Sequence, residues 1–189
     1  AEHGIPDSVA SRGLGDVYKR QYQYRVVYFK TNYRQNMEFE LVALGGTFDI
    51  IHVGHIALLE KGFSISKKVI IGLTSDEFAS RNGKDLENKF EIRHSKLKSL
   101  IQEKFLNSDF EIAKLENEFG PAVVEGNVQA LIVSTETHHK GDILNKLRDE
   151  KNLKPVKIIS VPMVLAEDGN RISTTRIRDM EIDFTGKLR

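Results

Sequence analysis

Apolar, β-branched runs recur along the chain from residue 37 onward. Two of them, KVIIGL and ALIVS, are almost wholly apolar, which is typical of strands buried on both faces of a sheet. The pattern predicts strands at residues 39–44, 68–73, 110–115, 130–134 and 156–164.

Helix-like stretches separate these runs. They cover residues 53–65, 75–81, 89–105, 141–152 and 173–180. Strands that alternate with helices predict βαβ units, right-handed crossovers and a parallel sheet. The expected fold class is therefore α/β, a Rossmann-like open parallel sheet of about five strands with helices on both faces.

Residues 1–36 differ from the rest of the chain. They show no sustained helical or strand period and lack the apolar core of a secretory signal, although YQYRVVYF would suit a short edge strand. Met37 stands just before the first clean strand. We expect residues 1–36 to be a non-native or weakly ordered leader and residues 37–189 to form one domain.

Composition limits the function classes. The chain has 189 residues, of which 40% are apolar and 29% charged, and its formal net charge of +1 gives no reason to expect nucleic acid as a partner. The chain contains no cysteine, which excludes disulfides and thiolate chemistry and suits a cytoplasmic protein. No apolar run approaches the roughly 20 residues that span a bilayer, so no membrane is expected.

Polar clusters follow three of the predicted strands. GGTFD comes after the first strand, TSDE after the second and STET after the fourth. In open parallel sheets, ligands bind outside the carboxyl ends of the strands. The candidate binding residues are therefore brought together by the expected topology.

The stretch LGGTFDIIHVGH holds the most specific pattern. Gly45 and Gly46 are expected to let the backbone turn sharply and approach a ligand. His52 and His55 project from one face of the first turn of a helix that begins near residue 53, and the start of a helix favours phosphate. The residues predict a phosphate cradle that contains no lysine.

Other readings of this stretch are open. Two histidines three residues apart can be metal ligands, but a structural zinc site would need four ligands, drawn from distant histidines such as His94 or His138. The stretch is neither a Walker A loop nor a dinucleotide fingerprint, because G-K-[ST] and G-x-G-x-x-G are both absent.

GGTFDIIHVGH resembles the G-x-F-D-x-x-H-x-G-H signature of the nucleotidyltransferase superfamily with the HIGH-like motif. The second signature of that superfamily, a Ser/Thr-rich turn followed by arginine, is matched by RISTTRIRD at residues 171–179. Two separated motifs in the right order make the resemblance specific. It implies that residues 37–189 form a nucleotidyltransferase domain.

Further segments narrow the resemblance. ALGGTFDIIHVGHIALLEKGF, VIIGLTSDEFA, FEIRHSKL, VSTET and PMVLAEDGNRISTTRIRDMEID look like archaeal-type phosphopantetheine adenylyltransferase, from about residue 40 to the C-terminus. The implied reaction converts ATP and 4′-phosphopantetheine to dephospho-CoA and pyrophosphate, a step of coenzyme A biosynthesis. These two substrates are the expected partners, and the chain is expected to act as a monomer.

Related activities are the alternatives. Glycerol-phosphate cytidylyltransferases share the first motif but normally carry R-T-E-G-I-S-T-T, where this chain has AEDGNRISTTRIR. Archaeal FAD synthetases also use a similar first motif. A non-catalytic nucleotide-binding domain is the alternative outside enzymes, although a sensor needs no transition-state donors.

The resemblance implies roles for individual residues. His52, His55 and Thr47 are expected to donate to phosphate oxygens in the transition state. Mg²⁺ is expected with ATP, without a metal site on the protein. The ATP site is expected to comprise Gly45, Gly46, Thr47, Phe48, His52, His55, Ser134, Glu136, Thr137, Ser173, Thr174, Thr175 and Arg176.

The acceptor phosphate needs a cation after the second strand. Lys84 is the first choice, with Arg93 as a further candidate and Lys89 as a competitor. Asp49 either orders its turn or orients a histidine, and the structural role is favoured. His138 and His139 are expected at the surface.

Overall fold

Five parallel strands form the centre of the computed structural model, which describes residues 37–124 and 126–189. Their order across the sheet is β3-β2-β1-β4-β5, and every neighbouring pair is parallel, so the expected sheet is confirmed. The expectations for residues 1–36 concern a segment outside this description. The strands are β1 (Phe39–Gly46), β2 (Ser66–Thr74), β3 (Asp109–Leu115), β4 (Ala130–Ser134) and β5 (Lys157–Val161).

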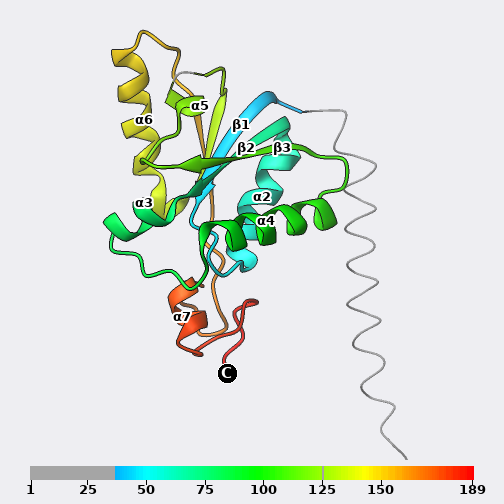
Figure 1. The fold of residues 1–189 in the computed structure, drawn as a ribbon. Coiled ribbons are helices and arrows are strands. Elements are labelled where there is room, and N and C mark those ends of the chain that lie inside the picture. The colour runs from blue at the N-terminus through cyan, green and yellow to red at the C-terminus, as the bar shows by residue number, and fades with distance from the viewer. Residues whose placement is uncertain (1–36, 125) are drawn as a thin grey trace, which may run out of the picture. The chain divides into compact units, whose positions relative to one another are not determined.

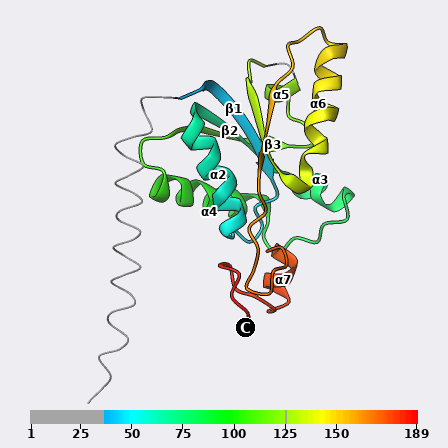
Figure 2. The same cartoon turned by 180° about the vertical axis from the view of Figure 1, so that it is seen from behind.

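Helices cover both faces of the sheet, as expected (Figures 1 and 2). Helices α2 (Val53–Ile65) and α4 (Phe90–Lys104) lie on one face, and α5 (Pro121–Val124) and α6 (His139–Glu150) lie on the other. Three short helical segments lie at the carboxyl ends of the strands: α3 (Asp76–Arg81), the 3-10 helix η1 (Thr135–Thr137) and α7 (Thr174–Arg178).

Alternation along β1 divides its side chains between the two faces. Ala43 packs in a buried cluster with Leu131 and with Leu144 of α6. On the other face, Gly62 of α2 lies close against Leu44, where an added Cβ would come within 3.2 Å of the leucine side chain. Each face thus has its own apolar layer, as a doubly covered parallel sheet requires.

The boundaries differ from the sequence prediction where short-range effects decide them. Strand β5 ends at Val161, before Pro162, which has no N–H for the ladder. Helix α7 ends at Arg178, and Met180 then takes a left-handed φ of 59°. Helix α5 and η1 were not predicted because they are too short to show a period.

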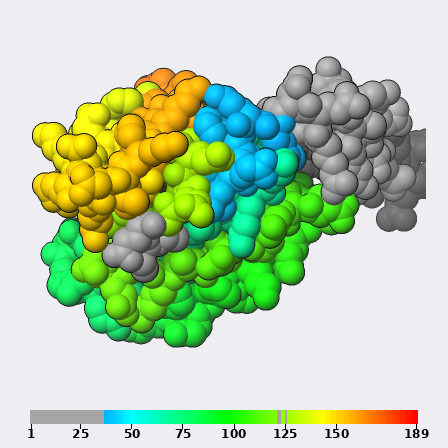
Figure 3. Space-filling model, turned by 90° about the horizontal axis from the view of Figure 1, so that it is seen from above, coloured from blue at the N-terminus to red at the C-terminus, as the bar shows by residue number. Residues whose placement is uncertain are grey.

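The strand order reverses direction at β1, whose neighbours are β2 and β4. The helical connections on the two sides of this point therefore pack on opposite faces of the sheet. Their divergence leaves a crevice at the carboxyl ends of β1 and β4. Figure 3 views the other end of the sheet, where the blue start of β1 lies between yellow-orange residues of the α6 side and green residues of the α4 side. Within residues 37–124 and 126–189, no helix is long and apolar enough to cross a membrane.

Candidate active site

A cavity of about 1050 Å³ lies at the crevice between the carboxyl ends of β1 and β4. It collects the polar clusters that follow the first, second and fourth strands. Of the predicted site residues, those that line it are Gly45, Gly46, Thr47, His52, His55, Lys84, Ser134, Glu136, Thr137, Ser173, Thr174 and Thr175.

The two histidines are fixed by the start of α2. The Nδ1 atom of His52 accepts the N–H of Gly54 at 3.2 Å, and the Nδ1 atom of His55 accepts the N–H of His52 at 3.4 Å. His52 is the N-cap of the helix, so the two side chains form a capping box built from histidine. Their rings stack with centroids 3.9 Å apart.

These bonds fix the protonation of both rings. An Nδ1 atom that accepts a backbone N–H carries no proton, so the neutral ring holds its proton on Nε2. Burial lowers the pKa of His52 to about 4. Burial, together with the charges of His52 and Lys84, lowers the pKa of His55 to about 3. Both rings are therefore neutral at pH 7 and present an Nε2–H donor.

The turn before α2 differs from the prediction. Gly45 and Gly46 are the last two residues of β1 rather than a turn, and the left-handed residue is Phe48, with φ of 48°. An added Cβ on Gly46 would lie 3.0 Å from the ring of Phe48, so this glycine makes room for that ring. Position 46 therefore requires a small residue, and it does not require a positive φ.

The expectation that Phe48 contacts ATP is corrected for its side chain. The ring is fully buried, does not line the cavity and packs against His55 with centroids 4.8 Å apart. The ring of Phe48 therefore packs against His55 within the core rather than facing the cavity.

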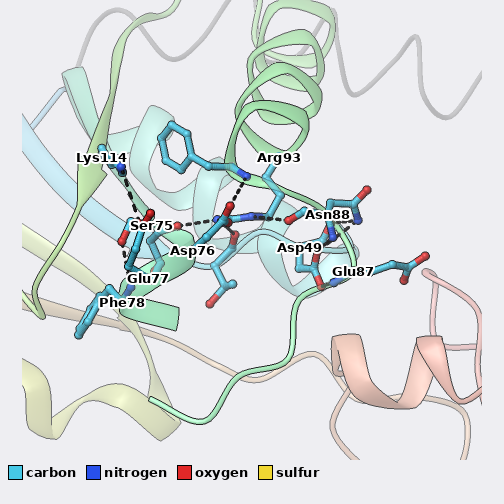
Figure 4. A network of polar contacts seen from close by, with 12 residues as sticks. Asp49, Ser75, Asp76, Glu77, Phe78, Glu87, Asn88, Arg93 and Lys114 are labelled. Carbon is cyan, nitrogen blue, oxygen red and sulfur yellow. Dashed lines mark hydrogen bonds and ion pairs between the residues drawn. The ribbon is translucent and has the colours of Figure 1, made fainter. Parts of the chain in front are cut away.

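Asp49 has the structural role that was favoured, by a contact that the sequence did not reveal. Its carboxylate is buried and accepts the N–H groups of Glu87 and Asn88, each at 2.9 Å. Figure 4 shows Asp49 beside these two residues. The aspartate joins the first turn to the loop that leads into α4, which is the loop that carries Lys84.

Lys84 reaches the first turn from this loop. Its Nζ donates to Thr47 Oγ1 at 2.9 Å. In this loop Gly83 takes a left-handed φ of 67°, which glycine adopts without steric cost. Burial lowers the pKa of Lys84, and the charge of Lys140 lowers it further.

Arg93 is not free to bind the acceptor phosphate, which corrects that expectation. Its guanidinium is fully buried and donates to Thr47 O at 2.6 Å, Thr74 O at 2.8 Å and Asp76 Oδ1 at 2.7 Å (Figure 4). These partners lie at the ends of β1 and β2, so Arg93 ties the carboxyl edge of the sheet to α4. Lys89, the competitor, is the N-cap residue of α4 and does not line the cavity.

Arg176 is also held by other residues of the chain. Its Nε donates to Glu181 Oε2 at 2.7 Å, its guanidinium pairs with Asp168, and it does not line the cavity. Arg178, two residues further on, does line the cavity, and it donates to the carbonyl of Asp85 at 3.1 Å. The arginine assigned to ATP, Arg176, thus lies outside the cavity lining, because a five-residue helix gives no period from which to predict the face of each side chain.

The remaining wall comes from η1 and the segment before α7. Ser134 and Thr137 hydroxyls lie 3.0 Å apart, and Glu136 pairs with Arg171. Ser173 is the N-cap of α7, and its side chain accepts the N–H of Arg176 at 3.3 Å. His138 and His139 are both exposed, as expected; His138 bonds Ser160 Oγ at 2.6 Å, and His139 lies at the edge of the cavity lining.

Several cavity residues were missed by sequence reasoning. Lys140 and Arg171 line the cavity, as does an apolar wall that includes Phe78, Leu115 and Phe119. Only their positions just after strands or motifs would have indicated them. Such positions are not specific, because exposed loops carry the same residue types.

Comparison with known proteins agrees with this geometry. A family model described as cytidylyltransferase-like matches residues 43–180. The chain belongs to this family. The match contains both the histidine turn and the segment that leads into α7.

Two relatives of this chain carry the name phosphopantetheine adenylyltransferase. The one from Methanothermobacter thermautotrophicus is 37% identical over 80% of this chain and 90% of its own length. The one from Methanosarcina barkeri is 44% identical over 78% of this chain and 92% of its own length. The resemblance inferred from the motifs is thus confirmed.

Solved structures share the fold. A protein of unknown function from Archaeoglobus fulgidus superposes with a TM-score of 0.59 and 29% identity, over 65% of this chain and 88% of that one. A tyrosyl-tRNA synthetase from the same organism, at 12% identity and a TM-score of 0.54, covers 82% of this chain and 62% of its own. At that identity the likeness shows the fold alone.

Proposed function

We propose that this chain transfers the adenylyl group of ATP to 4′-phosphopantetheine, which gives dephospho-CoA and pyrophosphate. The observation that carries the proposal is the pair of neutral histidine donors at the switch point, in a chain whose relatives of that name match it across the domain. We further propose that it acts in the cytoplasm as a monomer, without nucleic acid.

The chemistry needs positioned donors rather than a covalent intermediate. The acceptor phosphate attacks the α-phosphorus of ATP, the bond to the bridging oxygen breaks, and pyrophosphate leaves with the negative charge. The Nε2–H groups of His52 and His55 would donate to oxygens whose charge grows during this step. Their hydrogen bonds to the start of α2 hold them in place before ATP arrives, which is what preorganised stabilisation requires.

A neutral donor has an advantage over a charged one in this role. The histidines lose no proton on binding, and their partners do not change as charge moves from the α-phosphate to the leaving group. The positive charge would come instead from side chains at the cavity rim. Lys84, beside Thr47, is our candidate for the acceptor phosphate, and Arg178 lines the same cavity.

The other cavity residues would hold ATP. Gly45 and Gly46 offer close backbone approach beside Thr47. Hydroxyls that line the cavity from η1 and from the start of α7 can bind the ribose and the outer phosphates. These residues are Ser134, Thr137, Ser173, Thr174 and Thr175, with Glu136 beside them.

Mg²⁺ would enter with ATP. Across residues 37–124 and 126–189, no three His, Cys, Asp or Glu side chains cluster in a way that would hold a metal ion. Phosphate oxygens and water would therefore supply most of its ligands, which is usual for magnesium at nucleotide sites. When bound, the ion would neutralise charge on the phosphates.

A pyrophosphate-release panel tests the proposal. ATP and CTP are each combined with phosphopantetheine, glycerol phosphate, flavin mononucleotide and nicotinamide mononucleotide. We expect release with ATP and phosphopantetheine at least a hundredfold above every other pair. Release with CTP and glycerol phosphate, or with ATP and flavin mononucleotide, would assign the chain to another activity of the superfamily.

A matched variant separates an enzyme from a nucleotide sensor. Asparagine at position 52 can still cap α2 through its side-chain oxygen, but it does not extend to the position of Nε2. We expect His52→Asn to keep its melting temperature and ATP affinity while turnover falls at least tenfold. A sensor would show no turnover in either protein.

A further inference from the structure

A second lysine faces the site from the opposite side of β1. Lys84 comes from the loop between α3 and α4, which follows β2, whereas Lys140 lies in the first turn of α6, which follows β4. Since β2 and β4 are the two neighbours of β1, the lysines flank the end of β1.

Both lysines line the main cavity and also a smaller recess of about 280 Å³ beside it. The charge of Lys140 is close enough to lower the pKa of Lys84. Two like charges that face one recess repel each other, and an anion between them would relieve that repulsion. The other recess residues are Thr74, Phe78, Ala79, Asn82 and Glu118.

Lys140 is held only loosely where it stands. Its Nζ lies 3.2 Å from Glu118 Oε1, and both side chains are 42% exposed. A partly exposed pair of this kind contributes little free energy, so Lys140 can leave it at small cost. Lys84 retains donor capacity as well, because an ammonium group has three protons and its bond to Thr47 uses one.

We propose that Lys140 and Lys84 together bind the phosphate of the acceptor, with Glu118 holding Lys140 while the site is vacant. This rests on the proposed function, which requires a phosphate dianion beside the triphosphate of ATP. One lysine cannot neutralise a dianion, and the histidines supply no charge. The second cation comes from Lys140, and Glu118 opposes binding by competing for it.

The test compares steady-state constants of Lys140→Ala with those of Lys146→Ala, a matched control. Lys146 is an exposed lysine of the same helix that lines neither cavity, so both changes remove one charge. We expect Lys140→Ala to raise KM for phosphopantetheine about tenfold, or about 1.4 kcal/mol, and to leave KM for ATP within twofold. Lys146→Ala should change neither, and Lys140→Arg should restore most of the loss.

Two further arms make the assignment specific. Glu118→Gln should lower KM for phosphopantetheine two- to threefold, an effect opposite in sign to that of Lys140→Ala. Calorimetric affinity for pantetheine, which lacks the phosphate, should be the same in wild type and Lys140→Ala. An unchanged KM for phosphopantetheine in Lys140→Ala, a rise in KM for ATP instead, or equal loss of pantetheine affinity would overturn the inference.

The design also separates failure of the inference from failure of the proposed function. If wild-type protein releases no pyrophosphate with ATP and phosphopantetheine, the proposed function fails. The lysine comparison is then made with the phosphate-bearing acceptor that the panel identifies, or by calorimetry with inorganic phosphate if none reacts. Equal phosphate affinity of wild type and Lys140→Ala would then contradict the two-lysine site.

Discussion

The histidine turn and the lysine recess lie on the same cavity but are built in opposite ways. In the turn, residues 45–55, the two histidines are neutral and largely buried, and each accepts a backbone N–H group at the start of the helix. In the recess, the cations are partly exposed, and Lys140 and Glu118 form a weak pair. The turn is fixed before substrate binds, whereas the recess can rearrange around an anion.

This difference separates two tasks of the proposed reaction. Groups that act on the transition state must not reorganise during it, and the turn meets this condition. Groups that hold an incoming dianion must supply charge, and the recess supplies it. Variants of the turn should therefore change kcat, and variants of the recess should change KM.

The largest expected effect belongs to His55. We expect His55→Ala to lower kcat by about 10²–10³, the scale for loss of one preorganised donor, while KM for ATP moves much less. The measurement is steady-state pyrophosphate release at varied ATP, with the melting temperature as the control for folding. A large rise in KM for ATP at unchanged kcat would place His55 in ground-state binding and remove the contrast between the two regions.

Arg93 should affect stability rather than either kinetic constant. Arg93→Met would leave the carbonyls of Thr47 and Thr74 without their donor and Asp76 without its cation. We expect the free energy of unfolding to fall by about 3 kcal/mol, measured by denaturant titration. Arg81→Met, which removes an exposed arginine at the end of α3, should cost about 0.5 kcal/mol or less. Equal losses in the two variants would show that the buried network contributes nothing.

The two arginines also show where sequence reasoning stops. Arg93 and Arg176 were predicted to bind phosphate because their motifs and spacing suit that role, yet each has its charge occupied by partners from its own chain. Those partners include residues far along the sequence, such as Thr47 for Arg93. A one-dimensional pattern gives residue type and element but not which charges are already paired.

The sequence predicted the bounds of helices and strands correctly where interactions between residues close in sequence determine them. Helix α2 has the predicted bounds, because a cap residue fixes its start, and four of the five strands lie within two residues of their predicted ends. The polar clusters converge because parallel topology places carboxyl ends together. What the sequence could not show were tertiary choices: the Asp49 link to the Lys84 loop, the burial of Phe48 and the approach of Lys140.

The next prediction concerns Lys84, a cation of the recess, whose loss should change KM rather than kcat. Lys84→Ala should raise KM for phosphopantetheine at least tenfold, or about 1.4 kcal/mol, through loss of a charge-assisted hydrogen bond. ATP affinity measured by calorimetry should barely change. Lys89→Ala serves as the control, since that residue does not line the cavity. A loss with Lys89→Ala and none with Lys84→Ala would show that the wrong cation was chosen.

The last expected effect concerns pH and stability rather than a kinetic constant. The pKa of both histidines is lowered in the folded protein, so the unfolded chain binds more protons as pH falls below their ordinary value of 6.5. Stability is therefore complete above pH 6.5 and is lost as pH falls toward the folded values of about 4 and about 3. We expect a loss of about 2 kcal/mol from each histidine, or about 4 kcal/mol in all, between pH 7.5 and pH 5, measured by denaturant titration.

His52→Asn should lose about 2 kcal/mol less over the same range, because asparagine keeps the cap but does not titrate. Carboxylates contribute little in this window, since their unfolded pKa values lie near 4. An identical pH slope in the variant and the wild type would mean that His52 is not held neutral by burial.

The most direct test of the account is a competition for the acceptor. The protein is mixed with ATP, CTP, phosphopantetheine, glycerol phosphate and flavin mononucleotide at equal concentrations, and the products are identified by mass. The account predicts dephospho-CoA as the dominant product in wild type and in Lys146→Ala, and a fall of at least tenfold in its rate in His52→Asn. Accumulation of a cytidylylated or flavin product in place of dephospho-CoA would contradict it.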